Sequence, residues 1–434
     1  MEPIYERVLP LLRLVPEFAD SARASLGISD TLWAWIVYLV LIGSVVGILL
    51  GMVAYSVLFE RKVAGFVQER PGPNRVGPWG LFQPIADGIK LMFKEDIIHS
   101  GADKSVFKLA PFLAFIAPMT ALAAIPLAPG FYFANYATGL LFVFAFGGLA
   151  VLGILTAGYS SNNKFSLMGA LRGASQLISY EIPFLTTVLA TVLIVSAKYP
   201  GSALDLVKYV EFQSDGMWIV ALQPVGFVLF LICMVAETNR TPFDIPEGES
   251  EITGGFHTEY SGMRFAMFFL GEYAALIVMA LFGSVLYLGG WHGPPSITDI
   301  AARADGLVGM LGVIVTCLFW LAIIAMLIFV VIYGARRLKS SINHLTPVIF
   351  GLAGIGLILL HVLGSLSGLE FLHLGPVWMF AKMVFLIFIA MMARWTYLRL
   401  RVDQLTSFAW KFLFPVALIN LFVTGIIVML IYGK

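Results

Sequence analysis

The sequence contains very little cysteine, histidine or charge for a chain of 434 residues. Its two cysteines, Cys233 and Cys317, both lie inside apolar runs, so they offer neither a disulfide framework nor a metal-ligand spacing. Only His361 of the six histidines lies within an apolar run, so two histidines cannot face each other in a bundle around a haem. No phosphate-binding or dinucleotide-binding fingerprint is present. The sequence therefore predicts no redox cofactor, metal or nucleotide site in this chain, and electrons would have to come from partners.

Charged residues make up only 12% of the chain, and the net charge of +1 gives no basic surface for nucleic acid. Hydrophobic residues make up 59%, whereas soluble domains carry roughly 45–50%. The apolar runs are long enough to cross a bilayer as helices of about 20 residues. They are continuous rather than alternating, which excludes a membrane barrel. These features predict an all-α, polytopic transmembrane helical bundle.

We expect about ten spans and four regions along the chain. The spans are predicted near residues 33–59, 110–128, 136–158, 183–197, 218–236, 265–288, 307–333, 345–363, 376–393 and 412–432. Pro183 is expected to begin the fourth span. The regions are an N-terminal surface segment at 1–30, a membrane domain with six spans at 31–290, a helix pair at 307–363 and the C-terminal spans at 375–434.

The distribution of basic residues predicts the orientation of this bundle. Nineteen Lys and Arg residues fall on the side that holds the 60–108 loop, seven fall on the other side, and Lys382 lies within a span. Basic loops remain on the cytoplasmic side of membranes. We therefore expect the large loops in the cytoplasm and both termini on the outer side of the membrane.

The first cytoplasmic loop begins at Glu60 and contains several closely spaced Gly and Pro residues at 71–78, which cannot form a regular helix. A short helix is predicted from about Gln83 to Asp96. Its apolar face consists of Ile85, Ile89, Met92, Phe93 and Ile97. A helix of this kind lies in the membrane interface. It can serve as an entrance for a lipid-soluble ligand or simply as a membrane-surface helix.

The third cytoplasmic loop, residues 237–264, is unusually rich in carboxylates, and two further carboxylates lie in or beside the neighbouring apolar runs. An ionised carboxylate at a helix centre costs roughly 2.5–3.5 kcal/mol on insertion scales, so such groups usually face the bundle interior or water. Clustered carboxylates repel one another and titrate nearer to neutrality, which allows them to pass protons. Glu249 and Glu259 could equally belong to a solvated loop, whereas a proton relay explains Glu181, Glu237 and Glu272 better.

Four stretches resemble one family in long, irregular, Gly- and Pro-rich detail. They are ERKVAGFVQERPGPNRVGPWGLFQPIADGIKLMFKED at 60–96, SNNKFSLMGALRGASQLISYEIP at 161–183, AETNRTPFDIPEGESEITGGFHTEYSGMRFAMFFLGEYA at 236–274 and RLRVDQL at 399–405. The sequence is similar to the H subunit of bacterial NADH:quinone oxidoreductase (respiratory complex I), the homologue of the mitochondrially encoded subunit 1. The resemblance covers roughly residues 33–290 and 375–432.

The resemblance implies two sets of site residues. Those implied to line the quinone tunnel and head-group site are Glu60, Arg61, Arg70, Arg75, Asp87, Arg240, Asp244 and Arg264. Those implied to form the acidic proton relay are Glu181, Glu237, Glu247, Glu249, Glu251, Glu259 and Glu272. It also implies quinone as substrate, and partner subunits of complex I that carry FMN and iron–sulfur clusters, supply the quinone-site periphery and form the proton-pumping membrane arm.

Two features depart from the family pattern. Residues 307–363 form an apparent extra pair of spans, which preserves the inside/outside parity. Leu398 stands before RLRVDQL where the family usually has Pro, so the shape of that helix end is not given by the resemblance.

Three other functions compete with this interpretation. The membrane subunit of an energy-converting hydrogenase-type complex would lack the quinone tunnel, and the intact RPGPNRVGP loop argues against it. A secondary transporter would show inverted repeats and broken helices at the membrane centre. A purely structural anchor would leave the cost of Glu181, Glu237 and Glu272 unexplained.

Overall fold

The chain folds into a bundle of long helices in a computed structural model that describes residues 30–129, 136–215, 218–293 and 375–432, with five single positions between 321 and 332. These residues contain no β-strand. The long helices are α3 (Asp30–Val67), α5 (Lys104–Leu122), α6 (Gly139–Ser160), α7 (Lys164–Lys198), α12 (Gly262–Tyr287), α16 (Gly375–Thr396) and α18 (Phe414–Tyr432). The shorter ones are η1 (Pro78–Gly80), α4 (Gln83–Phe93), α8 (Leu206–Asp215), α9 (Ile219–Leu222), α10 (Pro224–Glu237), α11 (Glu249–Ile252), η2 (Gly255–His257), α17 (Val402–Phe408) and η5 (Ala409–Leu413).

The helical membrane fold is confirmed. Within the described ranges, seven helical segments are long and apolar enough to cross a membrane, the last of them running through α17, η5 and α18. The 14-residue α10 is a shorter apolar helix. Eight of the ten expected spans therefore correspond to helices. The N-terminal segment at 1–29 and, apart from the five single positions, the helix pair at 307–363 lie outside the described residues.

Two boundaries differ from the sequence prediction. The prediction that Pro183 begins the fourth span was wrong, because α7 starts at Lys164 and continues through this proline. Proline removes one backbone hydrogen bond, and a membrane helix tolerates the loss where neighbouring helices pack around it. The predicted fifth span is also divided at Gln223, between α9 and α10. The first difference places Glu181 about halfway along a continuous helix rather than at the mouth of one.

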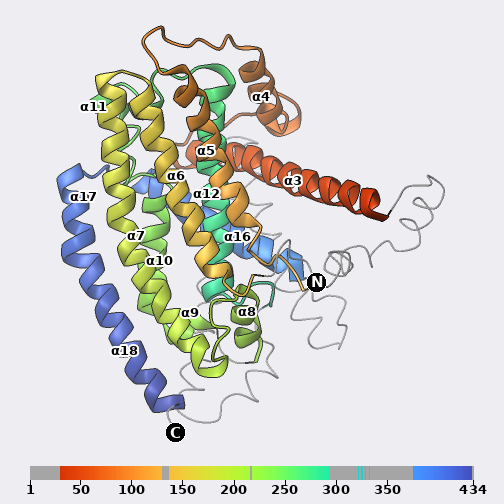
Figure 1. The fold of residues 1–434 in the computed structure, drawn as a ribbon, viewed down its shortest axis with the longest axis vertical. Helices are drawn as coiled ribbons and strands as arrows, with labels where there is room; N and C mark the ends of the chain where they lie inside the picture. The colour runs from red at the N-terminus through yellow and green to blue at the C-terminus, as the bar shows by residue number, and fades with distance from the viewer. Residues whose placement is uncertain are drawn as a thin grey trace.

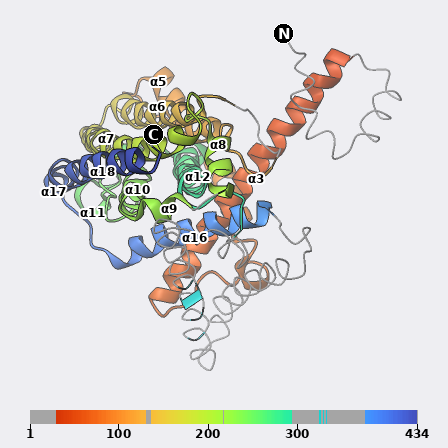
Figure 2. The same ribbon diagram turned by 90° about the horizontal axis from the view of Figure 1, so that it is seen from below.

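The helices place the large loops at one end of the bundle. Figure 1 shows α4, α11 and the start of α17 at one end, and α8 and α9 at the other. Helices α5, α6, α7 and α18 run along the long axis, whereas α3 is strongly inclined to them. Seen along that axis, α3 projects away from the bundle at its N-terminal half (Figure 2), where Trp35, Leu39 and Ile48 are exposed.

A buried lysine forms hydrogen bonds at the end of the bundle opposite α11. Lys382 of α16 donates hydrogen bonds to the backbone carbonyls of Leu288, Gly290 and His292, and its ammonium lies 4.4 Å from the centre of the Trp218 ring. These carbonyls follow the last turn of α12, where the backbone has no intrahelical donors. The lysine therefore satisfies backbone carbonyls at a helix terminus inside the bundle, which accounts for a polar side chain at this place.

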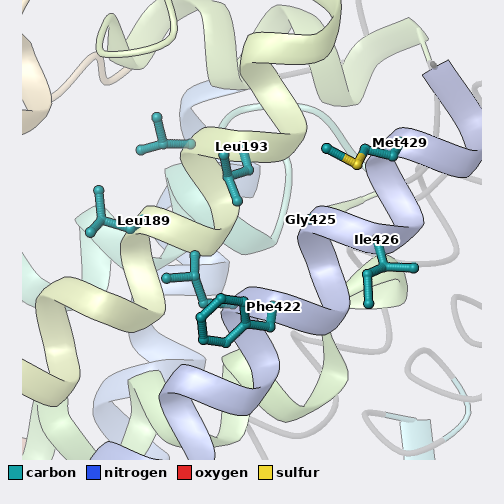
Figure 3. Close-up of a pocket in the computed structure, with 8 residues that line it drawn as sticks. Leu189, Leu193, Phe422, Gly425, Ile426 and Met429 are labelled. Atoms are coloured by element: carbon teal, nitrogen blue, oxygen red, sulfur yellow. The ribbon is translucent and has the colours of Figure 1, made fainter. Parts of the chain in front are cut away.

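The outer surface of the bundle is apolar. Helices α7 and α18 lie side by side and form a groove lined by side chains that include Leu189, Leu193, Phe422, Ile426 and Met429 (Figure 3). Because no charged or polar side chain lines this groove, it suits the hydrocarbon of a bilayer.

Candidate functional site

A buried carboxylate joins four separate parts of the chain. Glu60 of α3 accepts hydrogen bonds from Arg240 in the 238–248 loop, from Arg394 Nη1 of α16 at 2.6 Å and from Tyr273 Oη of α12 at 2.9 Å. Its side chain is only 6% exposed. A carboxylate with three donors keeps its charge despite burial. We call these four residues the Glu60 centre.

Arg240 is the most deeply buried member of the Glu60 centre, with a side chain that is 1% exposed. Its guanidinium lies 4.1 Å from the centre of the Tyr273 ring, while its Nε and Nη2 have no hydrogen-bond partner among the described residues. Burial alone would lower the pKa of Arg240, but the Tyr273, Glu60 and Glu272 side chains around it raise that pKa overall. The arginine therefore supplies a permanent positive charge beside the loop carboxylates.

A second set of carboxylates lies deeper in the bundle, against α6. A Cβ added to Gly147 would lie 4.0 Å from Glu237 Oε1, and a Cβ added to Gly148 would lie 3.9 Å from Glu181 Oε1. The two adjacent glycines therefore bring the carboxyl groups of α7 and α10 to one place on α6. Glu237 Oε2 is buried and has no hydrogen-bond partner among the described residues. Such an arrangement can exchange protons, because no described lysine or arginine holds either carboxylate in an ion pair.

Glu247 lies in the acidic loop, near Asp244 and near Glu272 of α12. Burial raises the pKa of Glu247 well above its ordinary value, and repulsion from Glu272 and Asp244 raises it further. His257 Nδ1 lies 3.9 Å from Glu247 Oε1, and burial lowers the pKa of His257 to about 4. The distance exceeds that of a hydrogen bond, so the two side chains are in contact without a hydrogen-bonded ion pair.

Three other predicted relay residues lie apart from this interior group. Glu251 accepts a hydrogen bond from Arg172 of α7 at 2.7 Å, and Glu259 accepts one from Asn163 Nδ2 at 2.6 Å. Asn163 is the N-cap of α7 and Arg172 lies in the first third of that helix, towards the end of the bundle that holds the large loops. Glu249 begins α11, and its side chain is outside the described part of the structure.

The amphipathic helix α4 presents its apolar side outwards. Ile85, Ile89, Met92 and Phe93 are each more than half exposed, as expected for a helix in contact with lipid. Beside it, Arg61 Nη1 donates to Asp87 Oδ2 at 2.7 Å and so joins the end of α3 to α4. The predicted helix is confirmed, although it ends at Phe93 instead of Asp96.

The remaining predicted cations lie around this surface. Arg70 donates through Nε to Gln68 Oε1 at 2.7 Å, and Arg75 is exposed. Arg264 pairs with Asp96 at 2.9 Å and connects the beginning of α12 to the segment after α4. These residues therefore shape the surface at the loop end of the bundle and make no hydrogen bond or ion pair with the Glu60 centre among the described residues.

Sequence reasoning did not identify Arg394, Tyr273 and Arg399. Arg394 was counted only as a basic residue at the end of a span, and Tyr273 adjoins Glu272 without any motif of its own. Arg399 lies in the RLRVDQL stretch, but its contact with the acidic loop depends on tertiary structure. The neighbourhood of each residue in the sequence therefore gave only a weak signal.

Among the described residues, no group of three His, Cys, Asp or Glu side chains has the arrangement of a metal site. Instead, Glu60 pairs with two arginines, and Glu181 and Glu237 approach two adjacent glycines of α6, an arrangement that suits proton movement and the binding of a polar group.

The sequence profile described as NADH dehydrogenase matches residues 40–425, which include all four Gly- and Pro-rich stretches and the carboxylates above. The chain belongs to the NADH dehydrogenase family. The similar proteins include the H subunit of NADH-quinone oxidoreductase from a Geobacillus species, which is 40% identical over 379 residues that cover 87% of this chain and 90% of that protein. The corresponding proteins of Anoxybacillus flavithermus and Brevibacillus brevis, which carry the same name, are 37% and 39% identical and cover 89% and 92% of this chain, and 92% and 94% of their own lengths.

Membership of the NADH dehydrogenase family confirms the resemblance derived from the loop sequences. The match spans both the N-terminal membrane domain and the C-terminal helices, so the Glu60 centre, which draws residues from both, lies wholly inside it. The relatives are subunits of an enzyme complex, and this chain is likewise a subunit of such a complex.

Proposed function

We propose that this chain forms the quinone access tunnel and part of the quinone site of a proton-pumping NADH:quinone oxidoreductase, and that its buried carboxylates couple quinone reduction to proton translocation. The observation that carries the proposal is the continuity between the Glu60 centre and the interior carboxylates. Glu272 of α12 lies near Arg240 of the Glu60 centre and near Glu247 of the loop, and Glu237 and Glu181 meet at Gly147 and Gly148 of α6. The names of the relatives support the reaction class.

In this proposal quinone enters beside α4 from the bilayer. The exposed apolar residues of α4 suit a lipid-soluble molecule, and Arg61 lies next to them at the end of α3. Arginine offers several fixed donors, which suit carbonyl oxygens better than the single ammonium of lysine does. The loop residues 237–264 would form the other wall and the inner end of the tunnel.

Reduction of one quinone to quinol consumes two electrons and two protons. The electrons would come from NADH through FMN and iron–sulfur clusters on partner subunits. Negative charge developing on the quinone would favour protonation of Glu247, because the carboxyl groups around it already disfavour its ionised form. The change in protonation would then be passed on through Glu272, Glu237 and Glu181 towards the proton-pumping membrane subunits. Interacting carboxyl groups take up and release protons as a set, so the cluster rather than one residue carries the coupling.

Partners and location follow from this proposal. The chain would be a multi-pass subunit of a bacterial plasma membrane, with the loop end of the bundle facing the cytoplasmic subunits. The surfaces of α7 and α18 would contact lipid or neighbouring membrane subunits.

Photoaffinity labelling of the assembled complex with an azido-quinone tests the tunnel. We expect labels within residues 60–96 and 237–264, and we expect an excess of quinone to prevent them. A label confined to the apolar groove of α7 and α18 would show that the quinone binds elsewhere. Purification of the complex through a tag on this chain should also recover the subunits that carry flavin and iron–sulfur clusters.

A further inference from the structure

The segment between α16 and α17 packs against the acidic loop. Residues 397–401 join Thr396 to Val402 and run beside the 242–248 segment. Leu400 N donates to Pro242 O at 3.2 Å, and Arg399 Nη2 donates to Ile245 O at 3.3 Å. Two hydrogen bonds therefore connect the C-terminal helices to the backbone on either side of Asp244.

The Arg399 guanidinium also packs directly on a glycine. A Cβ at Gly248 would lie 2.9 Å from Arg399 Nη1 and 3.0 Å from Cζ, and closer still to Nη2. Real Cβ atoms do not approach other heavy atoms so closely, so any residue but glycine at 248 would displace the guanidinium. Gly248 is buried and immediately precedes α11, and its carbonyl accepts hydrogen bonds from Glu251 N and Ile252 N, both at 2.8 Å. Arg399 therefore rests on the point where the loop turns into α11.

The neighbours of Arg399 are placed differently. Leu398 is 90% exposed and Tyr397 is 66% exposed, and Arg401 is exposed as well. Arg399 is half-buried, and its Nε is buried without a hydrogen-bond partner among the described residues. Two arginines of one short segment thus differ in that only Arg399 turns towards the loop that carries Glu247.

From these contacts we infer that Arg399 is a positioning residue for coupled quinone reduction, because it holds residues 242–248 in place and thereby keeps Asp244 and Glu247 beside Glu272 of α12. This inference rests on the proposed function for its effect on turnover. The contact between Arg399 and residues 242–248 does not depend on the proposed function, because hydrogen bonding and packing define it. Arg399 contacts Ile245 and Gly248, whereas Arg61 pairs with Asp87 on α4, so the loss of Arg399 is expected to change the rate of turnover rather than quinone affinity.

A double-mutant cycle in the purified complex tests this contact. Arg399→Gln removes the guanidinium, and Gly248→Ala pushes it away, so each variant should lower kcat for quinone reduction by roughly three- to tenfold while the KM for quinone stays within about twofold. The double variant should be no worse than the poorer single variant, because both changes abolish the same contact. Arg401→Gln, the matched control, should retain wild-type kcat and KM.

Effects that multiply in the double variant would overturn the inference, as would an unchanged kcat in both single variants or an equal loss in Arg401→Gln. Arg399→Lys, which keeps a donor for Ile245 O but not the flat contact with Gly248, should fall between wild type and Arg399→Gln, and it serves if the Gln variant does not assemble.

Hydrogen–deuterium exchange of the intact complex separates this inference from the proposed function. Amides of residues 242–252 should exchange faster in Arg399→Gln and Gly248→Ala, and at the wild-type rate in Arg401→Gln. Unchanged exchange in the first two variants would show that Arg399 does not hold the loop in place. The two ideas can also fail separately. If exchange is faster and the kcat effects do not multiply, Arg399 is a loop-positioning residue. If Glu181→Gln and Glu237→Gln nevertheless keep full pumping, the relay is rejected while the role of Arg399 is retained.

Discussion

Glu60 and Arg394 stand 334 positions apart in the chain and form an ion pair at 2.6 Å inside the bundle. The pair joins the first described helix to the C-terminal helices, and Arg240 completes it from the acidic loop. This carboxylate consequently fixes the relative positions of the three parts of the chain that contribute most to the candidate site.

Removing the charge of Glu60 should destabilise the complex strongly. Glu60→Gln leaves the buried guanidinium of Arg240 without its main counterion, and breaking a buried pair in this way typically costs about 3–5 kcal/mol. The measurement is the midpoint of thermal inactivation of the purified complex. We expect Glu60→Gln combined with Arg240→Met to be less damaging than Glu60→Gln alone. Thermal midpoints that simply add would mean that the two side chains do not depend on each other.

Arg61→Leu should raise the KM for quinone by roughly tenfold and leave electron transfer from NADH to a soluble acceptor almost unchanged. The reason is the position of Arg61 beside α4, where the proposal places the entrance of the quinone. Lys208→Leu provides the control, since Lys208 forms a comparable exposed ion pair with Glu211 at 2.6 Å but at the opposite end of the bundle. An equal loss with both electron acceptors would instead indicate defective assembly.

Acidic pH should weaken the fold through His257. Its folded-state pKa is about 4, below the ordinary 6.5, so between these values the unfolded chain binds a proton that the folded chain does not. Stability is therefore lost as pH falls from 6.5 towards 4, by on the order of 3 kcal/mol in total. Thermal inactivation measured across this range should depend less on pH in His257→Gln. An unchanged acid limb in that variant would contradict the assignment.

Glu247 should contribute the opposite dependence. Its pKa is raised in the folded chain, so the folded chain binds more protons above the ordinary value of 4.5, and this contribution is lost as pH rises. Glu247→Gln should therefore flatten the loss of thermal stability on the alkaline side of that value. A wild-type slope in Glu247→Gln would show that this carboxyl group is ionised in the folded state.

The sequence predicted the helical fold because long apolar runs have one stable form in a bilayer. It also predicted α4, since the periodicity of its apolar residues is local. Pro183 was misleading because a missing backbone hydrogen bond ends a helix only where nothing else supports it, and α7 is packed on several sides. The break at Gln223 has a local cause in Pro224, which was not used in placing the span.

The candidate site was only partly predictable for a different reason. Carboxylates in apolar surroundings are conspicuous, so Glu181, Glu237 and Glu272 could be selected one by one. Their partners could not be selected, because the pairing of Glu60 with Arg394, and the approach of Glu181 and Glu237 to two glycines of α6, depend on how distant helices pack.

The most direct test of the proton relay measures NADH:quinone turnover and proton uptake or release in the same proteoliposomes containing Glu181→Gln, Glu237→Gln or both. A neutral glutamine keeps the shape and removes the titration, so we expect turnover and pumping to fall together by at least about tenfold, with Glu211→Gln unchanged as the control. Full turnover with full pumping in all three relay variants would contradict the account, because the protons would then have to travel by another route.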